Sequence, residues 1–322
     1  MRPEKAIELA PPSIEMAGLS KSYGDFAALS DLNLKIEGSK CVGFLGPNGA
    51  GKTTTLKLLT DMIYPTAGEA FLDGVSVQKD RKRALARCGV LIESPEVYAS
   101  LTPREALEMV GGLRGLTPSE SSDRTSSVLE EVKMTEWADR KVGKFSKGMK
   151  QRINLAASLV HDPEILLLDE PSTGLDPRGM SEVRDIIRGL KRSQRLIFMS
   201  SHLLSEVTDV CDEVALINRG KLLFYDTLAN VTQRFSSGQS SVDATFSRPV
   251  EPPQQSKLAA IPKVASVEWL EPNRARVHFP AGLENQQQLL EAIVGLRLGL
   301  TSFQESKSLL EDIYLRQIER GD

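Results

Sequence analysis

Residues 41–54 read CVGFLGPNGAGKTT and contain a G-x-x-x-x-G-K-[ST] pattern that begins at Gly46. The pattern follows an apolar, β-prone run and precedes a helical one, which is the setting of a phosphate-binding loop. Its glycines let successive backbone N–H groups point at a polyphosphate, and the start of the helix adds its positive dipole end. Lys52 would reach the β- and γ-phosphates, and the Thr53 hydroxyl would hold Mg²⁺.

A glycine-rich turn that joins a strand to a helix is the alternative for this stretch, and the complete motif in this setting disfavours it. The sequence therefore predicts nucleotide binding. The candidate binding residues of the loop are Gly46, Pro47, Asn48, Gly49, Ala50, Gly51, Lys52, Thr53 and Thr54.

Two adjacent carboxylates follow the run from Ile165 to Leu168, which is continuously apolar as a central parallel strand must be. Asp169 and Glu170 should thus lie at the carboxyl end of a buried strand, where doubly wound sheets bind ligands. We expect Asp169 to hold Mg²⁺, directly or through water, and Glu170 to polarise the water that attacks a γ-phosphate. The alternative is a strand end that has simply become polar.

His202 and Tyr23 are candidate site residues because the same chain contains a phosphate loop and a pair of carboxylates at a strand end. His202 follows another buried run and could contact a γ-phosphate, although a lone histidine is usually structural, as we expect for His161 and His278. Tyr23 lies in a turn and could stack on an adenine ring, and the alternative is packing against its own sheet.

Alternating patterns predict the elements that position these residues. Residues 14–36 read as antiparallel strands around a turn, and the short apolar runs described above read as strands of an α/β core. Residues 101–160 read as a helical insertion, and two of its helices begin with Thr-Pro and a capping-box Glu, at Thr102 and Thr117.

The composition changes to Ser, Gly and Gln near residue 236, and a second α/β pattern in the order βαββαβ follows, ending in a helix over 309–320. That order resembles a ferredoxin-like unit. We expect a leader over residues 1–13, a nucleotide-binding domain over 14–235, a linker over 236–241 and a small α+β domain over 242–322.

The composition of the chain limits the classes of protein to which it can belong. The 322 residues are 40% hydrophobic and 26% charged, as in ordinary globular chains, and the net charge of −3 argues against a nucleic-acid partner. The three cysteines are far apart, which favours reduced core thiols in a cytosolic protein. No apolar run approaches the roughly 18 residues that span a bilayer, so we expect a chain soluble by itself.

Taken together, these motifs resemble those of ABC-type ATPases, over roughly residues 14–232. Residues 46–53 match the Walker A loop, 145–149 the signature, 168–170 Walker B, 172–176 the D-loop, and His202 the switch histidine. The resemblance implies a phosphate-loop NTPase with a RecA-like core, an antiparallel β subdomain and a helical subdomain. It also implies ATP and Mg²⁺ as ligands, and ATP hydrolysis as the activity.

In that family two such domains face each other, and ATP lies between the Walker A loop of one and the signature of the other. Ser146 and Gly148 would then contact the partner's γ-phosphate, and Asp176 would belong to the same nucleotide site. The resemblance therefore implies a dimer, with a second copy or a paralogous subunit, and an integral membrane permease as partner. It places the chain in the cytoplasm, on the inner face of the membrane.

Two departures from the family pattern concern the site. The usual signature LSGGQ is FSKGM here, so Lys147 and Met149 replace a glycine and the glutamine. The second is Glu93, which stands where many relatives carry a glutamine near Mg²⁺, and a glutamate there can still hold a metal-bound water. These features and the C-terminal domain resemble subunits of drug-resistance and antibiotic exporters.

Other functions remain open at this point. A soluble ABC ATPase that acts on ribosomes or DNA usually has two cassettes or a long coiled coil, and this chain has one cassette without sustained heptads. A phosphate-loop kinase would lack residues 145–149. The C-terminal domain has no catalytic cluster of its own, and dimerisation or regulation is the role that remains open for it.

Overall fold

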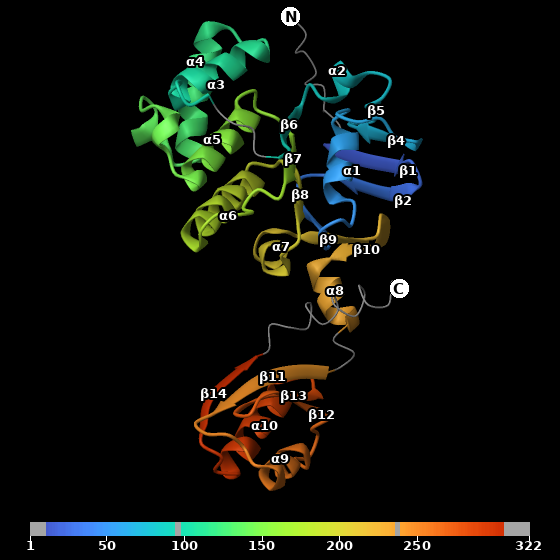
Figure 1. Cartoon of the computed structure of the whole chain (residues 1–322), viewed down its shortest axis with the longest axis vertical. Coiled ribbons are helices and arrows are strands. Elements are labelled where there is room, and N and C mark those ends of the chain that lie inside the picture. Colours follow the sequence, from blue (N-terminus) through green and yellow to red (C-terminus); the bar gives the residue numbers. More distant parts are fainter. Residues whose placement is uncertain (1–10, 94–97, 236–238, 306–322) are drawn as a thin grey trace, which may run out of the picture. The chain divides into compact units, whose positions relative to one another are not determined.

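The computed structural model describes residues 11–93, 98–235 and 239–305, which divide into two compact units (Figure 1). The first unit ends at Leu228 and the second begins at Ala229, earlier than the predicted end of the nucleotide-binding domain at residue 235. Helix α8 (Leu228–Phe235) thus falls almost wholly in the second unit. Most of the predicted leader and the whole of the predicted last helix lie outside the described residues.

The central sheet of the first unit has the strand order β10-β9-β3-β8-β7-β6. All neighbours are parallel except β10, which pairs antiparallel with β9. Every residue of β3, β7 and β8 is buried, as expected for apolar strands covered on both faces. The strands are β3 (Cys41–Leu45), β6 (Cys88–Leu91), β7 (Ile165–Asp169), β8 (Leu196–Ser201), β9 (Glu213–Asn218) and β10 (Lys221–Thr227).

The register of this sheet brings the candidate site residues to one edge. Leu45 at the end of β3 is opposite Ser201 of β8, and Asp169 at the end of β7 is opposite Ser200. Because parallel strands end at the same edge, the phosphate loop, the carboxylate pair and His202 all leave the sheet side by side.

A second, antiparallel sheet has the order β2-β1-β4-β5 and includes the pair predicted over residues 14–36. Helix α1 (Lys52–Leu59) buries its leucines in the same core as both sheets, so it lies packed between them. The strands are β1 (Ser13–Tyr23), β2 (Phe26–Glu37), β4 (Ala67–Leu72) and β5 (Val75–Ser76), and the short helix α2 (Arg81–Ala84) follows them.

The predicted helical insertion contains α3 (Pro103–Leu113), α4 (Pro118–Glu131), two 3₁₀ turns (Thr135–Trp137 and Val142–Lys144) and α5 (Lys147–Leu159). The capping box at Thr102 is confirmed: its hydroxyl accepts from the Glu105 amide at 3.2 Å, and its amide donates to the Glu105 carboxylate at 2.7 Å. Two further helices flank the site, α6 (Pro177–Arg192) after β7 and α7 (Leu204–Val210) after β8.

The second unit has the predicted element order βαββαβ, with the antiparallel sheet order β12-β13-β11-β14. It has an apolar core of its own, distinct from that of the first unit. After α8, its elements are β11 (Gln239–Phe246), α9 (Pro252–Ala259), β12 (Ser266–Glu271), β13 (Arg274–Pro280), α10 (Leu283–Gly295) and β14 (Leu300–Glu305).

The predicted linker over residues 236–241 is wrong in its second half. Gln239, Ser240 and Ser241 belong to β11 and pair with Pro280, Phe279 and His278. Their polar side chains resemble a linker in composition, whereas the pairing runs through backbone groups that composition does not reveal. A ferredoxin-like unit remains our proposal for this part of the chain.

The separate cores predict that residues 1–238 fold without the rest of the chain. The deletion of residues 239–322 removes the second core and leaves that of the first unit complete. In scanning calorimetry we expect the fragment to keep one cooperative transition close to that of the first unit in the full chain. A fragment without a cooperative transition would show that the two units depend on each other.

Candidate functional site

The phosphate loop is held by close backbone contacts that require glycine. A Cβ at Gly46 would lie 2.4 Å from the Ile217 carbonyl oxygen, and one at Gly51 would lie 2.7 Å from that of Ala28. Gly51 also has φ = +105°, a conformation that other residues rarely adopt. The loop between β3 and α1 is therefore fixed against both sheets.

Lys52 is the first residue of α1, and its side chain points into the loop. It is 5% exposed, and its ammonium donates to the carbonyl oxygens of Gly46 at 2.8 Å and Pro47 at 3.0 Å. The same nitrogen lies 3.3 Å from Oε1 of Glu170. The loop thus carries a buried positive charge at the position where a polyphosphate would bind.

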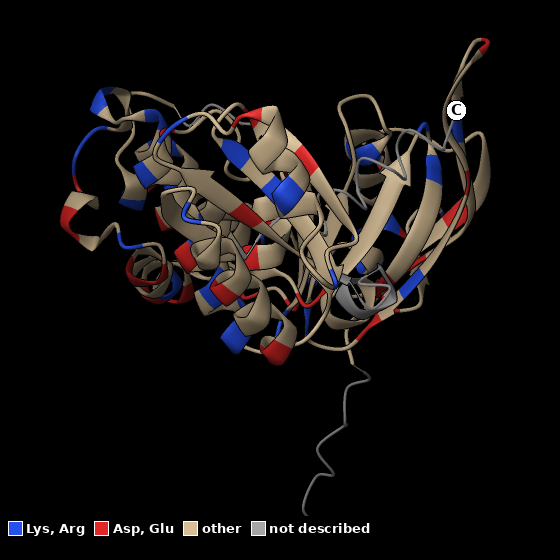
Figure 2. Cartoon of the chain, turned by 90° about the horizontal axis from the view of Figure 1, so that it is seen from below, with Lys and Arg blue, Asp and Glu red and all other residues tan. Residues whose placement is uncertain are grey.

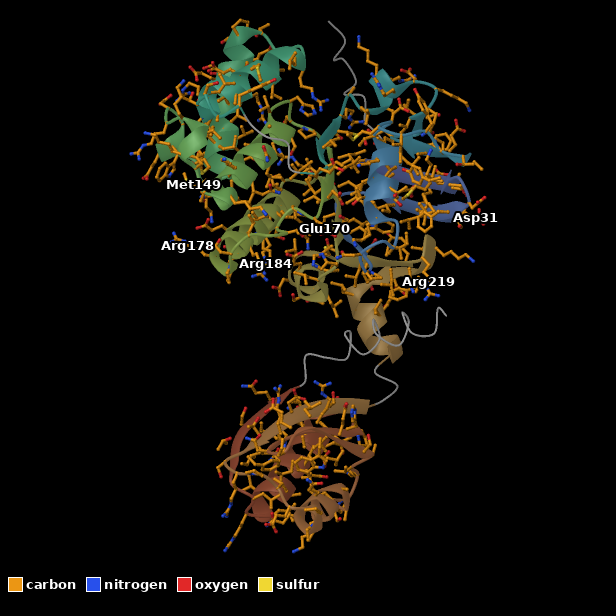
Figure 3. The ribbon with its side chains drawn as sticks, viewed as in Figure 1. Asp31, Met149, Glu170, Arg178, Arg184 and Arg219 are labelled. Carbon is orange, nitrogen blue, oxygen red and sulfur yellow. The ribbon has the colours of Figure 1, made fainter. Side chains whose placement is uncertain are left out.

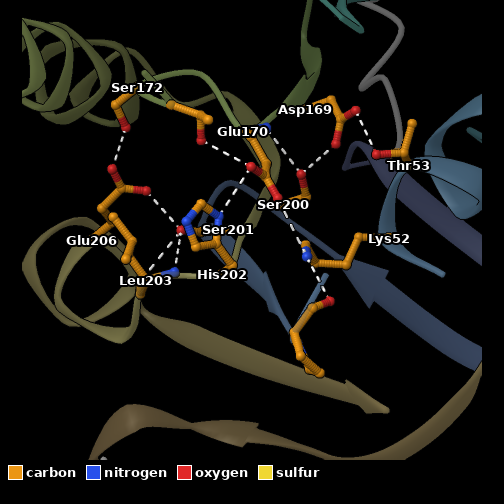
Figure 4. Close-up of polar contacts among 12 residues, drawn as sticks. Lys52, Thr53, Asp169, Glu170, Ser172, Ser200, Ser201, His202, Leu203 and Glu206 are labelled. Atoms are coloured by element: carbon orange, nitrogen blue, oxygen red, sulfur yellow. Dashed lines mark hydrogen bonds and ion pairs between the residues drawn. The ribbon is translucent and has the colours of Figure 1, made fainter. Parts of the chain in front are cut away.

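Asp169 and Thr53 meet across the gap between β7 and α1. The Thr53 hydroxyl donates to Oδ2 of Asp169 at 2.8 Å, and the Ser200 hydroxyl donates to Oδ1 at 2.5 Å (Figure 4). Asp169 is 9% exposed, so these hydrogen bonds satisfy a largely buried carboxylate.

Glu170 points away from Asp169 because the chain turns sharply at this residue. Its φ of +43° lies in the left-handed region, which costs a residue with a side chain about 1–3 kcal/mol. Its amide donates to the Ser200 hydroxyl at 2.9 Å, which holds the turn. Oε2 accepts from the Thr173 hydroxyl at 2.9 Å and from Nδ1 of His202 at 3.0 Å.

The surroundings of Glu170 keep it ionised. Burial raises the pKa of this carboxyl, but the hydrogen bond from Thr173 and the electrostatic attraction of the Lys52 and His202 side chains together outweigh burial. The net pKa of Glu170 lies below its ordinary value. A proton acceptor is thus present at neutral pH beside the ammonium of Lys52.

Tyr23 lies beside the phosphate loop, as expected for a residue that could stack on a base. It is 50% exposed and lines a hollow of about 270 Å³ together with residues of the loop and Glu170. Phe26, at the start of β2, lines the same hollow and is 65% exposed. Two exposed aromatic side chains therefore border the space next to the phosphate loop. The lining residues are Tyr23, Phe26, Ala28, Asn48, Gly49, Gly51, Lys52, Thr53, Thr54 and Glu170.

Ser146, Gly148 and Asp176 lie elsewhere on the same unit and do not line this hollow. Ser146 caps α5 by accepting from the Met149 amide at 3.2 Å, and Asp176 caps α6 by accepting from the Gly179 amide at 3.1 Å. The two helix starts are adjacent, and Met149 and Arg178 mark them in Figure 3, apart from Glu170.

Glu93 follows β6 and is mostly exposed. Its carboxylate forms an ion pair with Lys57 of α1 at 2.6 Å, while Asp169 is hydrogen-bonded to Thr53 and Ser200. Within the described ranges, no three His, Cys, Asp or Glu side chains are grouped as metal ligands. The oxygens of Thr53 and Asp169 nevertheless suit Mg²⁺, which commonly takes its remaining ligands from water and substrate phosphates.

Sequence reasoning assigned no role to Ser200, Thr173 or Phe26. Ser200 and Thr173 are ordinary polar residues in sequence, and their roles depend on the pairing of β7 with β8 and on the turn at Glu170. A signal for Phe26 was present, because an aromatic residue three positions after Tyr23 falls on the other side of the same turn.

The chain is similar to known proteins over most of its first unit. The ABC transporter family model matches residues 29–173. The bacitracin transport ATP-binding protein BcrA of Bacillus licheniformis is 42% identical over 211 residues, covering 65% of this chain and 68% of BcrA. YxlF of Bacillus subtilis, described as an uncharacterized ABC transporter ATP-binding protein, is 33% identical over 305 residues, covering 95% of this chain and 99% of YxlF.

A solved ATP-binding subunit of an ABC transporter superposes with a TM-score of 0.62 at 26% identity, covering 69% of this chain and 93% of that structure. The chain belongs to the ABC transporter family of ATP-binding proteins, and it is an ATPase of the type that its motifs predict. No helix within the described ranges combines the length and the apolar character needed to cross a membrane.

The lowered pKa of Glu170 predicts a pH-dependent contribution to stability. Because the folded-state pKa lies below the ordinary one, the ionised carboxylate stabilises the fold above the ordinary pKa of a glutamate. That contribution is lost as the pH falls toward the lowered value. In urea unfolding across this acidic range, the stability advantage of the wild type over Glu170→Gln should shrink. An advantage independent of pH would contradict the assignment.

Proposed function

We propose that this ATPase powers an exporter in the membrane, and that hydrolysis is centred on Glu170. The observation that carries the proposal is the position of this carboxylate, held between Lys52 of the phosphate loop and His202 at the end of β8. The three groups come from three strand ends that the register of one sheet brings together.

The chemistry follows from these positions. The loop amides and Lys52 bind the β- and γ-phosphates, and an adenine ring occupies the hollow bordered by Tyr23 and Phe26. Glu170 accepts the proton of a water that attacks the γ-phosphorus, while the bond to the β-phosphate oxygen breaks and ADP leaves. His202 orients Glu170 through Nδ1, and its ring would also contact the γ-phosphate.

Thr53 and Asp169 are our proposed Mg²⁺-binding residues, because a hydroxyl and a carboxylate oxygen lie 2.8 Å apart at the start of α1. The ion would neutralise charge on the β- and γ-phosphates. Glu93 remains a proposal as an outer residue that holds a metal-bound water, and it would have to leave Lys57 to do so.

A dimer completes the proposed site. Ser146, Gly148 and Asp176 lie at the starts of α5 and α6, outside the hollow that contains Lys52. The amide groups and dipole at the start of α5 suit a γ-phosphate, so a second copy or a paralogous subunit would supply them to this loop. Loss of the γ-phosphate removes that contact, and the two halves part.

The exporter proposal rests on the family and on the relative that is named for bacitracin transport. We propose an integral membrane permease as partner, with the chain bound at the cytoplasmic face of the membrane. Action on ribosomes or DNA is the alternative, and the net charge of −3 and the interspersed acidic and basic residues in Figure 2 disfavour it. Recovery of the chain with ribosomes and not with an integral membrane protein would favour that alternative.

The variant Glu170→Gln tests the proposed base. It keeps the size of the side chain but cannot accept a proton at neutral pH. We expect hydrolysis to fall by about a hundredfold or more while ATP still binds, which traps an ATP-bound dimer. Phosphate release measures hydrolysis, and gel filtration with ATP measures the dimer.

Glu164→Gln is the matched control, because Glu164 directly precedes β7 at its opposite end and pairs with Arg87. We expect that variant to hydrolyse ATP like the wild type. Normal turnover by Glu170→Gln would remove Glu170 from the role of base.

A further inference from the structure

Glu206 is a buried carboxylate next to the site, and the proposed function gives it no role. It lies in the first turn of α7 and is 1% exposed. Its two oxygens accept from two serines, Oε1 from Ser172 at 2.5 Å and Oε2 from Ser201 at 2.7 Å (Figure 4). A carboxylate is costly to remove from water, so these hydrogen bonds account for its burial.

The two serines belong to the two loops that carry the proposed hydrolytic groups. Ser172 directly precedes Thr173, whose hydroxyl donates to Glu170. Ser201 directly precedes His202, which contacts the same oxygen of Glu170. The two loops are thus joined twice, once by the contact of Glu170 with His202 and once through Glu206.

A backbone group close to each serine forms a further hydrogen bond. The Ser201 hydroxyl accepts from the amide of Leu203 at 3.0 Å, and Leu203 precedes α7 as its N-cap residue, without a side-chain cap hydrogen bond. On the other loop, the carbonyl oxygen of Pro171 accepts from the side-chain amide of Gln151 in α5 at 2.7 Å. Glu206 therefore connects two segments that have little freedom to move separately.

We propose that Glu206 is a positioning residue, which fixes the loop of Glu170 against the loop of His202 through Ser172 and Ser201. Glu206 does not contact the nucleotide, and it acts by holding Glu170 and His202 in position. The inference rests on the proposed role of Glu170 in hydrolysis. It predicts an effect on turnover that is separate from ATP binding and from stability.

The test compares Glu206→Ala with Glu206→Gln in the full chain. The alanine variant loses both hydrogen bonds, and we expect kcat to fall about tenfold or more while the Kd for ATP changes less than about twofold. The glutamine variant keeps the size and one acceptor oxygen, and its amide N–H can donate to the other serine. We expect it to recover most of the lost kcat, and a glutamine variant no better than alanine would overturn positioning by hydrogen bonds.

The serine variants keep the inference testable if Glu206→Ala does not fold. Ser172→Ala and Ser201→Ala each remove one of the two bonds, and each should lower kcat by about threefold or more without a change in the Kd for ATP. If Glu206→Ala folds, adding either serine substitution to it should not lower kcat further, because the hydrogen bond between that serine and Glu206 is already lost. Additive losses in kcat would overturn the connection.

Glu213→Gln is the matched control for the loss of a partly buried carboxylate. Glu213 lies at the opposite end of the sheet, where it accepts from Lys40 at 2.9 Å and from Tyr225. We expect this variant to lower the melting temperature and leave kcat unchanged.

The outcomes separate this inference from the proposed function. A wild-type level of kcat in Glu206→Ala would overturn the positioning role while leaving Glu170 as the base. Normal turnover by Glu170→Gln would instead remove Glu170 from the role of base, and with it the hydrolytic pair that Glu206 is proposed to position.

Discussion

The turn at the end of β7 is the constraint on which the site depends. Asp169 and Glu170 are adjacent in sequence, and two carboxylates facing one pocket would repel each other. The left-handed backbone at Glu170 sends their side chains to different partners, Asp169 to Thr53 and Glu170 to Lys52 and His202. Ser200 stabilises this turn from the neighbouring strand, since its hydroxyl donates to the Asp169 carboxylate and accepts from the Glu170 amide. The strained backbone thus separates the carboxylate that we propose to bind Mg²⁺ from the one that we propose as proton acceptor, although the two are adjacent in sequence.

The rest of the first unit serves to keep that turn next to the phosphate loop. Parallel pairing of β3, β8 and β7 sets the three strand ends side by side, and α1 packs between the two sheets so that Lys52 and Thr53 face the carboxylates. The loop itself depends on glycine at Gly46 and Gly51, because any Cβ there would collide with the backbone of β9 or β2. The signature residues lie on another part of the same unit, which is why one chain supplies only half of the proposed site.

The sequence was sufficient to predict those elements and motifs that depend only on neighbouring residues. The phosphate loop, the apolar run before Asp169 and the capping box at Thr102 are each defined by neighbouring residues, and the structure has the predicted strands and helix there. Ser200 and Glu206 acquire their places only through strand register and through loops that meet across the sheet, so no local pattern identifies them. The prediction of the linker was wrong for a related reason, because the serines of β11 pair through backbone groups and resemble a flexible segment in composition. The role of Glu93 near Mg²⁺ rests on resemblance and stays a proposal, and its carboxylate pairs with Lys57 in this structure.

We propose that Asp169 binds Mg²⁺ and that Glu170 does not, and the Mg²⁺ dependence of ATP affinity distinguishes these roles. Calorimetric titration of ATP, with and without Mg²⁺, compares Asp169→Asn with Glu170→Gln in the full chain. We expect Mg²⁺ to strengthen ATP binding in the wild type and in Glu170→Gln, and we expect Asp169→Asn to lose most of this gain. Equal dependence on Mg²⁺ in the two variants would contradict separate roles for Asp169 and Glu170.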